Sequence, residues 1–232
     1  MKRFWKEVTV AEVEGGWQVF LDGRSVRTPA KLDCTVPRRS MADRIRAEWD
    51  ATEGEVQPLE MPMTRTAATC LDRVAPDAKA VRQSLVAYGE TDLLCYRAPH
   101  PVELAERQRL AWDPVLAWAR SDLGSHLVLT EGVMHVRQST DAIDALASFV
   151  EETDAWTLTC LADLVTISGS LVLGLAILRG FLTADDAWSR SRIDEDWNTE
   201  EWGDDAEAAA LAARRQADFL HAADVLRLLA AD

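Results

Sequence analysis

The sequence lacks the motifs that mark the commonest catalytic sites. It has no glycine-rich phosphate loop, no G-x-S-x-G nucleophile motif and no H-E-x-x-H metal motif. Its four histidines lie far apart in the sequence and beside no obvious nucleophile: His100, His126, His135 and His221. A histidine in such a setting is typically a surface residue or a satisfied core residue. We therefore expect no enzyme activity, no cofactor and no small-molecule substrate.

Cysteine is scarce and scattered. The four cysteines, Cys34, Cys70, Cys95 and Cys160, form no C-x-x-C pair and have no histidine at ligand spacing. This pattern argues against the common zinc motifs, so no metal site is expected. We predict reduced, mostly buried thiols of the kind found in intracellular proteins.

Positive charge and long apolar runs are also in short supply. Lys and Arg number 25 against 39 Asp and Glu, which leaves a net charge of −14 and argues against a nucleic-acid partner. The most apolar run, Leu164 to Leu178, is fifteen residues long. Because a bilayer crossing needs about twenty, we expect no membrane insertion. No apolar run follows residues 1–3, since Phe4 and Trp5 lead into Lys6, so no signal peptide is expected.

The N-terminal region has the alternation of β-strands. Residues 8–13, 17–21 and 32–36 alternate apolar and polar side chains, with glycine-containing turns after the first two runs. One helix follows, with Ser40 as its predicted N-cap and an apolar stripe that includes Trp49. We predict an α+β fold: a small antiparallel β-rich domain with one helix over residues 1–63, then a larger all-helical domain over residues 64–232.

The spacing of apolar residues is helical almost throughout the second region. Candidate helices cover residues 64–74, 77–88, 102–112, 114–121, 140–152, 156–167, 168–179, 184–202 and 206–230. Residues 58–63 contain two prolines and are predicted to be a linker, and residues 127–137 are ambiguous, with room for a short strand pair. Small residues in the apolar run 164–178 would allow a neighbouring helix to approach closely.

Negative charge is concentrated near the C-terminus. Residues 185–207 hold ten acids against two arginines, a net charge of −8. A helix is predicted to begin at Thr183, which has the spacing of a capping pair with Asp186. One narrow face of that helix would hold Ala184, Trp188, Ser191, Glu195, Asn198 and Trp202.

Glu195 is predicted to lie in the middle of this packing face. An unpaired buried carboxylate costs several kcal/mol, so it must be hydrogen-bonded, ion-paired or neutralised. Two alternatives stay open: the acids form an ordinary solvated face, or Glu195 pairs with an arginine of a neighbouring helix. Carboxylate catalysis with Asp194 or Asp196 is disfavoured, because adjacent residues on a helix point to different faces. Trp197 among acids is instead typical of an interface.

Several short motifs, in this order and spacing, resemble those of one family. They are Leu21-Asp22-Gly23-Arg24 with Thr28-Pro29, Glu48-Trp49, Met61-Pro62-Met63-Thr64, Tyr88 with Thr91-Asp92-Leu93-Leu94-Cys95-Tyr96-Arg97, Gln108 with Trp112-Asp113-Pro114, Gly169-Ser170-Leu171, and the acidic segment ending in Trp202-Gly203. The chain resembles the F1-ATPase assembly chaperone family over nearly its whole length. Thr52 and Asn198 stand where that family usually carries glutamine.

The resemblance implies a chaperone without ATPase activity that binds the unassembled alpha subunit of F1 ATP synthase. It would mask the aggregation-prone interface of that subunit and release it to the beta subunit. Glu195 matches the functionally critical glutamate of the family, and the predicted partner-binding residues are Glu195, Asp194, Asp196, Trp197, Asn198 and Trp202. The predicted structural motif positions are Trp49, Asp92, Trp112 and Asp113.

Two other function classes compete with this hypothesis. An acidic adaptor or regulator would present carboxylates to a basic protein partner, and its binding would fall steeply with salt. A carboxylate-based hydrolase would need a deep pocket around Glu195. With no targeting presequence recognised, a bacterial cytoplasm is expected, or the mitochondrial matrix for a processed eukaryotic form.

Overall fold

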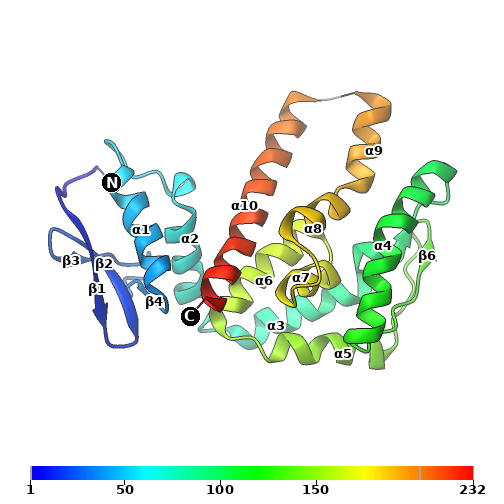
Figure 1. Cartoon of the computed structure of the whole chain (residues 1–232), viewed down its shortest axis with the longest axis horizontal. Coiled ribbons are helices and arrows are strands. Elements are labelled where there is room, and N and C mark those ends of the chain that lie inside the picture. Colours follow the sequence, from blue (N-terminus) through cyan, green and yellow to red (C-terminus); the bar gives the residue numbers. More distant parts are fainter. Residues whose placement is uncertain (1, 204, 232) are drawn as a thin grey trace. The chain divides into compact units, whose positions relative to one another are not determined.

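The computed structural model describes residues 2–203 and 205–231, and its order of strands and helices confirms the α+β fold class (Figure 1). The chain divides into two compact units. The first contains Met1–Ala78, Ala155–Cys160 and Asp224–Asp232, and the second contains Lys79–Asp154 and Leu161–Ala223. The boundaries of these units differ from the predicted domain boundary at residue 63. The assignment of domains to 1–63 and 64–232 stays a prediction.

The first unit is built on an antiparallel sheet. Its strands are β1 (Val8–Val13), β2 (Gly16–Leu21), β3 (Arg24–Ser25) and β4 (Thr35–Val36), and β2 pairs with each of the others. The predicted hairpin of residues 8–13 and 17–21 is confirmed, whereas the strand predicted at 32–36 is shortened to two residues. Gly16 has φ +145°, and a Cβ there would collide with the carbonyl oxygen of Val36. Only glycine fits this turn.

Helix α1 (Arg39–Ala51) covers the sheet with a buried stripe that includes Ile45 and Trp49. Its predicted N-cap, Ser40, is wrong. Arg38 has the extended backbone of an N-cap, and its carbonyl accepts the first helical hydrogen bond from Ala42 N at 3.3 Å. The helix therefore begins two residues earlier than a Ser40 cap would allow.

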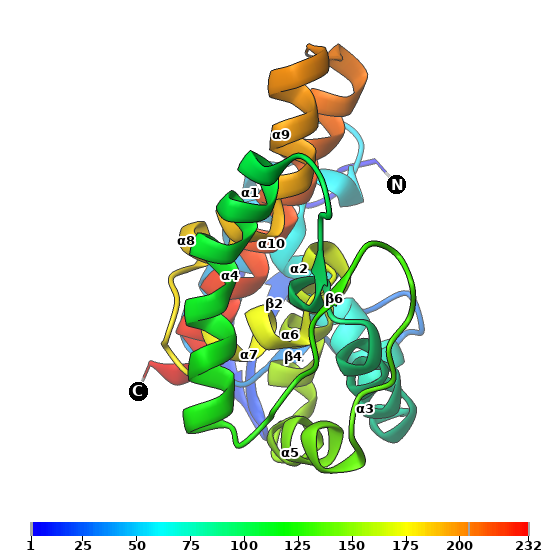
Figure 2. The same ribbon diagram turned by 90° about the vertical axis from the view of Figure 1, so that its right-hand side faces the viewer.

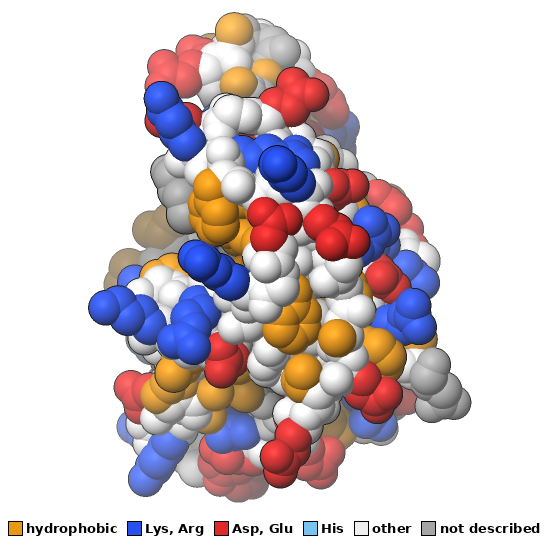
Figure 3. All heavy atoms as spheres, turned by 90° about the vertical axis from the view of Figure 1, so that its left-hand side faces the viewer, with side chains coloured by type: hydrophobic (Ala, Val, Ile, Leu, Met, Phe, Trp, Pro, Cys, Tyr) orange, Lys and Arg blue, Asp and Glu red, His pale blue; other side chains and the backbone are white. Residues whose placement is uncertain are grey.

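On the face shown in Figure 3, basic and acidic side chains are intermixed.

A carboxylate of α1 holds the N-terminus of the next helix. After the 3₁₀ turn η1 (Pro58–Glu60) come α2 (Pro62–Thr69) and a π-helical turn, η2 (Cys70–Val74). The Glu48 carboxylate accepts hydrogen bonds from Met63 N at 2.6 Å, Thr64 N at 2.8 Å and Thr64 Oγ1 at 2.6 Å. Burial raises the pKa of Glu48, while the bonds from Thr64 and Met63 oppose that shift. The segment predicted as a linker is therefore partly helical and tied to α1.

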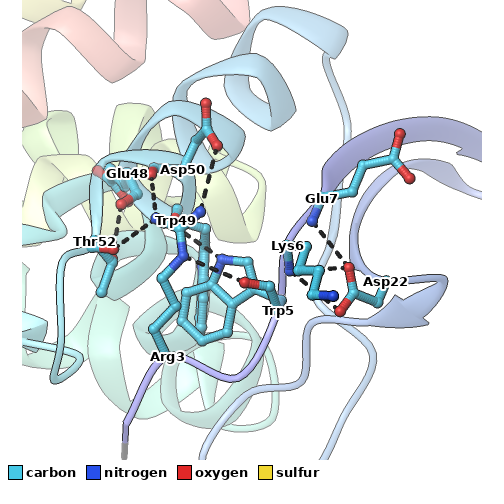
Figure 4. Close-up of polar contacts among 9 residues, drawn as sticks. All are labelled: Arg3, Trp5, Lys6, Glu7, Asp22, Glu48, Trp49, Asp50 and Thr52. Carbon is cyan, nitrogen blue, oxygen red and sulfur yellow. Dashed lines mark hydrogen bonds and ion pairs between the residues drawn. The ribbon is translucent and has the colours of Figure 1, made fainter.

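Trp49 lies in the core of the first unit, close to the chain start (Figure 4). The rings of Trp5 and Trp49 pack edge to face at 5.1 Å, and Trp5 Nε1 donates to the Trp49 carbonyl at 3.3 Å. The Arg3 guanidinium donates to the carbonyls of Asp50 and Thr52, each at 2.8 Å. These contacts add to the bonding of carbonyls at the C-terminal end of α1, where the Trp49 carbonyl also accepts from Thr52 N at 3.4 Å. This setting is that of a structural residue.

The remaining elements are mostly helical. They are α3 (Ala78–Ala87), η3 (Tyr88–Thr91), η4 (Leu93–Cys95), β5 (Tyr96–Arg97), α4 (Val102–Asp122), β6 (Thr130–Glu131), α5 (Thr140–Glu151), α6 (Ala155–Ser168), α7 (Leu171–Leu178), α8 (Ala184–Ser191), α9 (Ile193–Trp202) and α10 (Ala206–Ala230). The two helices predicted at 102–112 and 114–121 are one, because α4 continues through Pro114. Pro114 has no N–H to donate to the Leu110 carbonyl, so α4 lacks one helical hydrogen bond at this point. β6 pairs in parallel with the distant β5.

The apolar run 164–178 lies in the core of the second unit. It is interrupted at Gly169, where φ is +74°, and residues Leu171 to Ala176 of α7 are buried. A Cβ on Gly174 would lie 2.8 Å from Val165 Cγ2, so the predicted close approach of a neighbouring helix is confirmed for α6 and α7. In the part of the chain that the structure describes, no helix has both the length and the apolarity to cross a bilayer.

Asp92 holds the N-terminus of α7. It is fully buried and accepts hydrogen bonds from Leu94 N at 3.1 Å, Ser170 Oγ at 2.8 Å and Val172 N at 3.0 Å. Ser170 is the N-cap of α7 and accepts from Leu173 N. Burial raises the pKa of Asp92 to about 6, and the hydrogen bonds from Val172, Ser170 and Leu94 limit that rise. The carboxyl group therefore ties the segment between η3 and η4 to the core helix.

The pKa shift of Asp92 predicts a pH-dependent stability. Because its folded pKa exceeds its unfolded value, its favourable contribution is complete below about pH 4 and is lost as the pH rises through about 6. We expect the free energy of unfolding of the wild type, relative to Asp92→Asn, to decrease between pH 5 and pH 8. Urea unfolding of both proteins across this range measures the difference. A difference independent of pH would contradict the prediction.

Candidate functional site

The acidic segment forms two helices rather than one. α8 ends at Ser191, Arg192 has φ −106° and ψ 3°, and α9 begins at Ile193. Thr183 caps α8 as predicted, since its Oγ1 accepts from Asp186 N at 3.1 Å. The break at Arg192 ends the helical phase that relates Trp188 to the residues of α9. The single face predicted from Ala184 to Trp202 is therefore wrong.

This break moves Glu195 out of the packing face. Its side chain is 51% exposed, so the predicted shelter of this carboxylate is wrong. Glu195 Oε1 lies 3.3 Å from Arg192 Nη1, in an ion pair within the segment rather than with a neighbouring helix. Asp194, Glu195 and Asp196 all lie in the first turn of α9. Negative charge is favourable there because the helix dipole places partial positive charge at its N-terminus.

One side of α9 is fixed to α4, which lies beside α8 and α9 (Figure 2). The Gln108 amide is 1% exposed; its Nε2 donates to Asp194 Oδ1 at 2.6 Å and its Oε1 accepts from Ala98 N at 2.8 Å. Arg107 makes two parallel hydrogen bonds of 2.8 Å to Glu200 and lies 5.1 Å above the Trp197 ring. Asp194 and Trp197, both predicted to bind a partner, thus have structural contacts within the chain.

α4 also fixes the end of α8 through the Trp112-Asp113 motif. The buried Trp112 donates from Nε1 to the Arg190 carbonyl at 2.8 Å, and Arg190 Nε donates to the Ala111 carbonyl at 3.2 Å. Asp113 accepts from Arg97 at 2.8 Å, and that guanidinium lies 5.2 Å from the Trp112 ring. Trp112 and Asp113 therefore both make contacts within the chain, and their role as structural motif positions stays a prediction.

The other side of α9 lines a groove that separates it from the first half of α10. The groove has a volume of about 550 Å³, and Asp196, Asn198 and Trp202 are among its lining residues. Its α10 wall is made largely of alanines: Ala208, Ala209, Ala212 and Ala213. Trp202 stands at the end of α9 with 86% of its surface exposed. Three of the six residues predicted to bind a partner therefore share one concave surface.

The turn between α9 and α10 has local sequence causes. Gly203, with φ +92°, ends α9 in a conformation that favours glycine. The Asp205 carboxylate accepts from Glu207 N at 2.8 Å and Ala208 N at 3.0 Å and so caps α10. Those two bonds lower the pKa of Asp205. Negative charge is thereby placed at the end of the groove where the chain turns from α9 to α10.

The charge of the groove is mainly acidic. Asp196 and Asp205 line it, and Arg192 is the one basic side chain among its described lining residues. Arg192 is 3.3 Å from Glu195 and 3.8 Å from Asp196, so its charge is already balanced within the chain. A partner at this groove would meet small apolar side chains, one exposed tryptophan and an excess of negative over positive charge.

Sequence reasoning missed the alanines of α10 and Arg107. The alanines recur at i, i+1, i+4 and i+5 from Ala208, a spacing that places them on one side of a helix. That signal was readable in the sequence. The link between Arg107 and Glu200, 93 positions apart, had no local signal.

The thiols and the metal-ligand side chains add no second site. All four cysteines are buried, as predicted, and burial raises the pKa of both Cys34 and Cys95 to about 12. Such thiols are unreactive at neutral pH. Within residues 2–203 and 205–231, no group of three or more His, Cys, Asp or Glu side chains is placed to hold a metal ion.

The Gln108 contacts predict a stability effect. Gln108→Ala leaves the Asp194 carboxylate and the Ala98 N–H without their partner, so we expect a loss of about 2 kcal/mol in the free energy of unfolding. The matched control is Arg109→Ala on the same helix. Arg109 is exposed and makes its two bonds to Glu106 within α4, so little change is expected. Chemical unfolding measures both variants, and equal losses would contradict the assignment.

Comparison with known proteins places the chain in a family. The model of the ATP12 chaperone protein family matches residues 2–120. Atp12 from Paracoccus denitrificans is 42% identical, with a TM-score of 0.93 over 98% of this chain and 97% of that one. The Atu1473 protein from Agrobacterium tumefaciens is 43% identical, with a TM-score of 0.93 over 98% and 86% of the two chains. Protein atp12, mitochondrial, from Schizosaccharomyces pombe is 22% identical over 214 residues, which cover 87% of this chain and 74% of that protein. The chain therefore belongs to the ATP12 family, the assembly chaperones of F1-ATPase.

Proposed function

We propose that this chaperone binds the unassembled alpha subunit of F1 ATP synthase, masks its aggregation-prone interface and releases it to the beta subunit. The observation that carries the proposal is the groove between α9 and α10, with alanines on one wall and Trp202 at its end. A subunit waiting for its neighbours exposes apolar surface that promotes aggregation. A concave surface of small apolar side chains can cover such a patch and keep the subunit soluble.

The acidic rim supports fast and reversible binding. Carboxylates around a binding surface raise the rate of encounter with a partner of complementary charge more than they raise affinity. The α10 wall of the groove offers little to enclose a client, since most of its side chains are alanines that end at Cβ. A client held in this way can be displaced by a neighbour that covers more of the same surface. We propose that the beta subunit is that neighbour.

The competing functions have weaker support from the site. A hydrolase would need Glu195 in a deep pocket, whereas Glu195 is half exposed and lies outside the described lining of the groove. An acidic adaptor remains the second candidate because the groove has an excess of carboxylates. We propose that the chain works where F1 is assembled: the bacterial cytoplasm, or the mitochondrial matrix for a processed eukaryotic form.

Trp202 provides the most direct test. Full burial of a large aromatic side chain contributes about 2–3 kcal/mol, so Trp202→Ala should weaken binding of the alpha subunit more than about tenfold. The matched control is Leu211→Ala, because Leu211 is an exposed apolar residue of α10 that does not line the groove. Co-expression with a tagged alpha subunit, followed by pull-down, measures both. Equal binding by wild type and Trp202→Ala would remove the groove from the proposed function.

Glu195 requires a separate test because its predicted role rests on the resemblance. We expect Glu195→Gln to lower the soluble yield of co-expressed alpha subunit, with the fold intact by circular dichroism. The substitution keeps the side chain's shape and removes one acid beside the groove. Unchanged solubility would remove Glu195 from the mechanism. A steep fall of wild-type binding with salt, together with normal binding by Trp202→Ala, would favour the adaptor instead.

A further inference from the structure

α9 is attached to α4 at two levels. Gln108, itself 1% exposed, holds the first turn through Asp194 in a part-buried hydrogen bond. Arg107 holds the last turns through Glu200 and Trp197. Arg107 and Glu200 are 41% and 55% exposed, so this outer attachment is open to water.

The outer attachment lies next to the part of α9 that carries the exposed tryptophan. Trp202 follows Glu200 by two residues, at the end of the helix. The backbone is non-helical on both sides of α9, at Arg192 and at Gly203. The helix can therefore pivot as a rigid body about its N-terminal end. Its displacement would change the separation between α9 and the alanine wall of α10. The hydrogen bonds to Arg107 oppose such a displacement.

We propose that Arg107 is a positioning residue for client binding, which sets the width of the groove by holding the outer half of α9 through Glu200 and Trp197. This inference rests on the proposed function, because it assumes that the groove is where the client binds. Arg107 itself does not line the groove. A preformed groove avoids the cost of ordering α9 at the moment of binding, so loss of this contact weakens binding.

The geometry favours arginine over lysine at this position. Two parallel N–H···O bonds to one carboxylate need the planar guanidinium, and the same plane stacks on the Trp197 ring. The mutual hydrogen bonds lower the pKa of Glu200 and raise that of Arg107, so both groups stay charged at neutral pH. A lysine would retain the charge and lose the two-point geometry.

A charge swap tests the inference. Arg107→Glu and Glu200→Arg should each weaken binding of purified alpha subunit about five- to tenfold, because like charges then face each other across α4 and α9. The double variant should bind within about twofold of wild type, since the swap restores an opposite-charge pair. Binding is measured by titration of the tagged alpha subunit, with unfolding curves to show that each variant is folded.

Arg109→Glu is the matched control. Arg109 is the neighbouring exposed arginine, and it pairs with Glu106 by bonds of 2.8 and 2.7 Å inside α4. It should leave client binding unchanged. Normal binding by both single variants would overturn the inference. So would weakened binding by the single variants that is not restored in the double variant. If Trp202→Ala weakens binding while the Arg107 variants do not, the proposed function stands and this inference alone fails. If the wild type binds no alpha subunit, the proposed function itself fails.

Discussion

The hydrogen bonds of the Gln108 amide are the contact on which the geometry of the site depends. One neutral side chain accepts from Ala98 N and donates to the Asp194 carboxylate, so it joins the segment after β5, helix α4 and the first turn of α9. Because both ends of the buried amide are satisfied, a shift of α9 would leave the Gln108 amide and the half-buried Asp194 carboxylate without their hydrogen bond. The direction of α9, and with it one wall of the groove, follows from this contact.

The same principle recurs at other helix N-termini, where side-chain oxygens satisfy N–H groups that have no helical partner. Glu48 does this for α2, Asp92 for α7 and Asp205 for α10. For α2 and α7 the carboxylate comes from a segment far from the helix in the sequence. This explains why short motifs far apart in sequence occur together: Glu48-Trp49 meets Met63-Thr64, and Asp92 meets Ser170-Leu171. Each pair is one structural joint.

The features predicted correctly from the sequence are those with local causes. The β1–β2 hairpin follows from alternation and Gly15-Gly16, and Thr183 caps α8 through a residue three positions away. The errors arise where tertiary contacts decide. The helical wheel assumed one continuous helix, and a single non-helical residue, Arg192, was enough to expose Glu195. α4 continues through Pro114 against its local preference, and the groove depends on the relative placement of α9 and α10, which no periodicity encodes.

The acidic segment also opposes self-association through the exposed Trp202. An apolar surface suited to a client is equally suited to a second copy of the chaperone, unless something disfavours self-association. Trp202 stands alone between Glu201 and Gly203, and the net charge of −8 over residues 185–207 repels an identical segment. A client whose binding surface is basic or neutral does not meet that repulsion. In the proposed binding mode, charge at this site therefore disfavours self-association of the chaperone, while the groove would supply the contact area for the client.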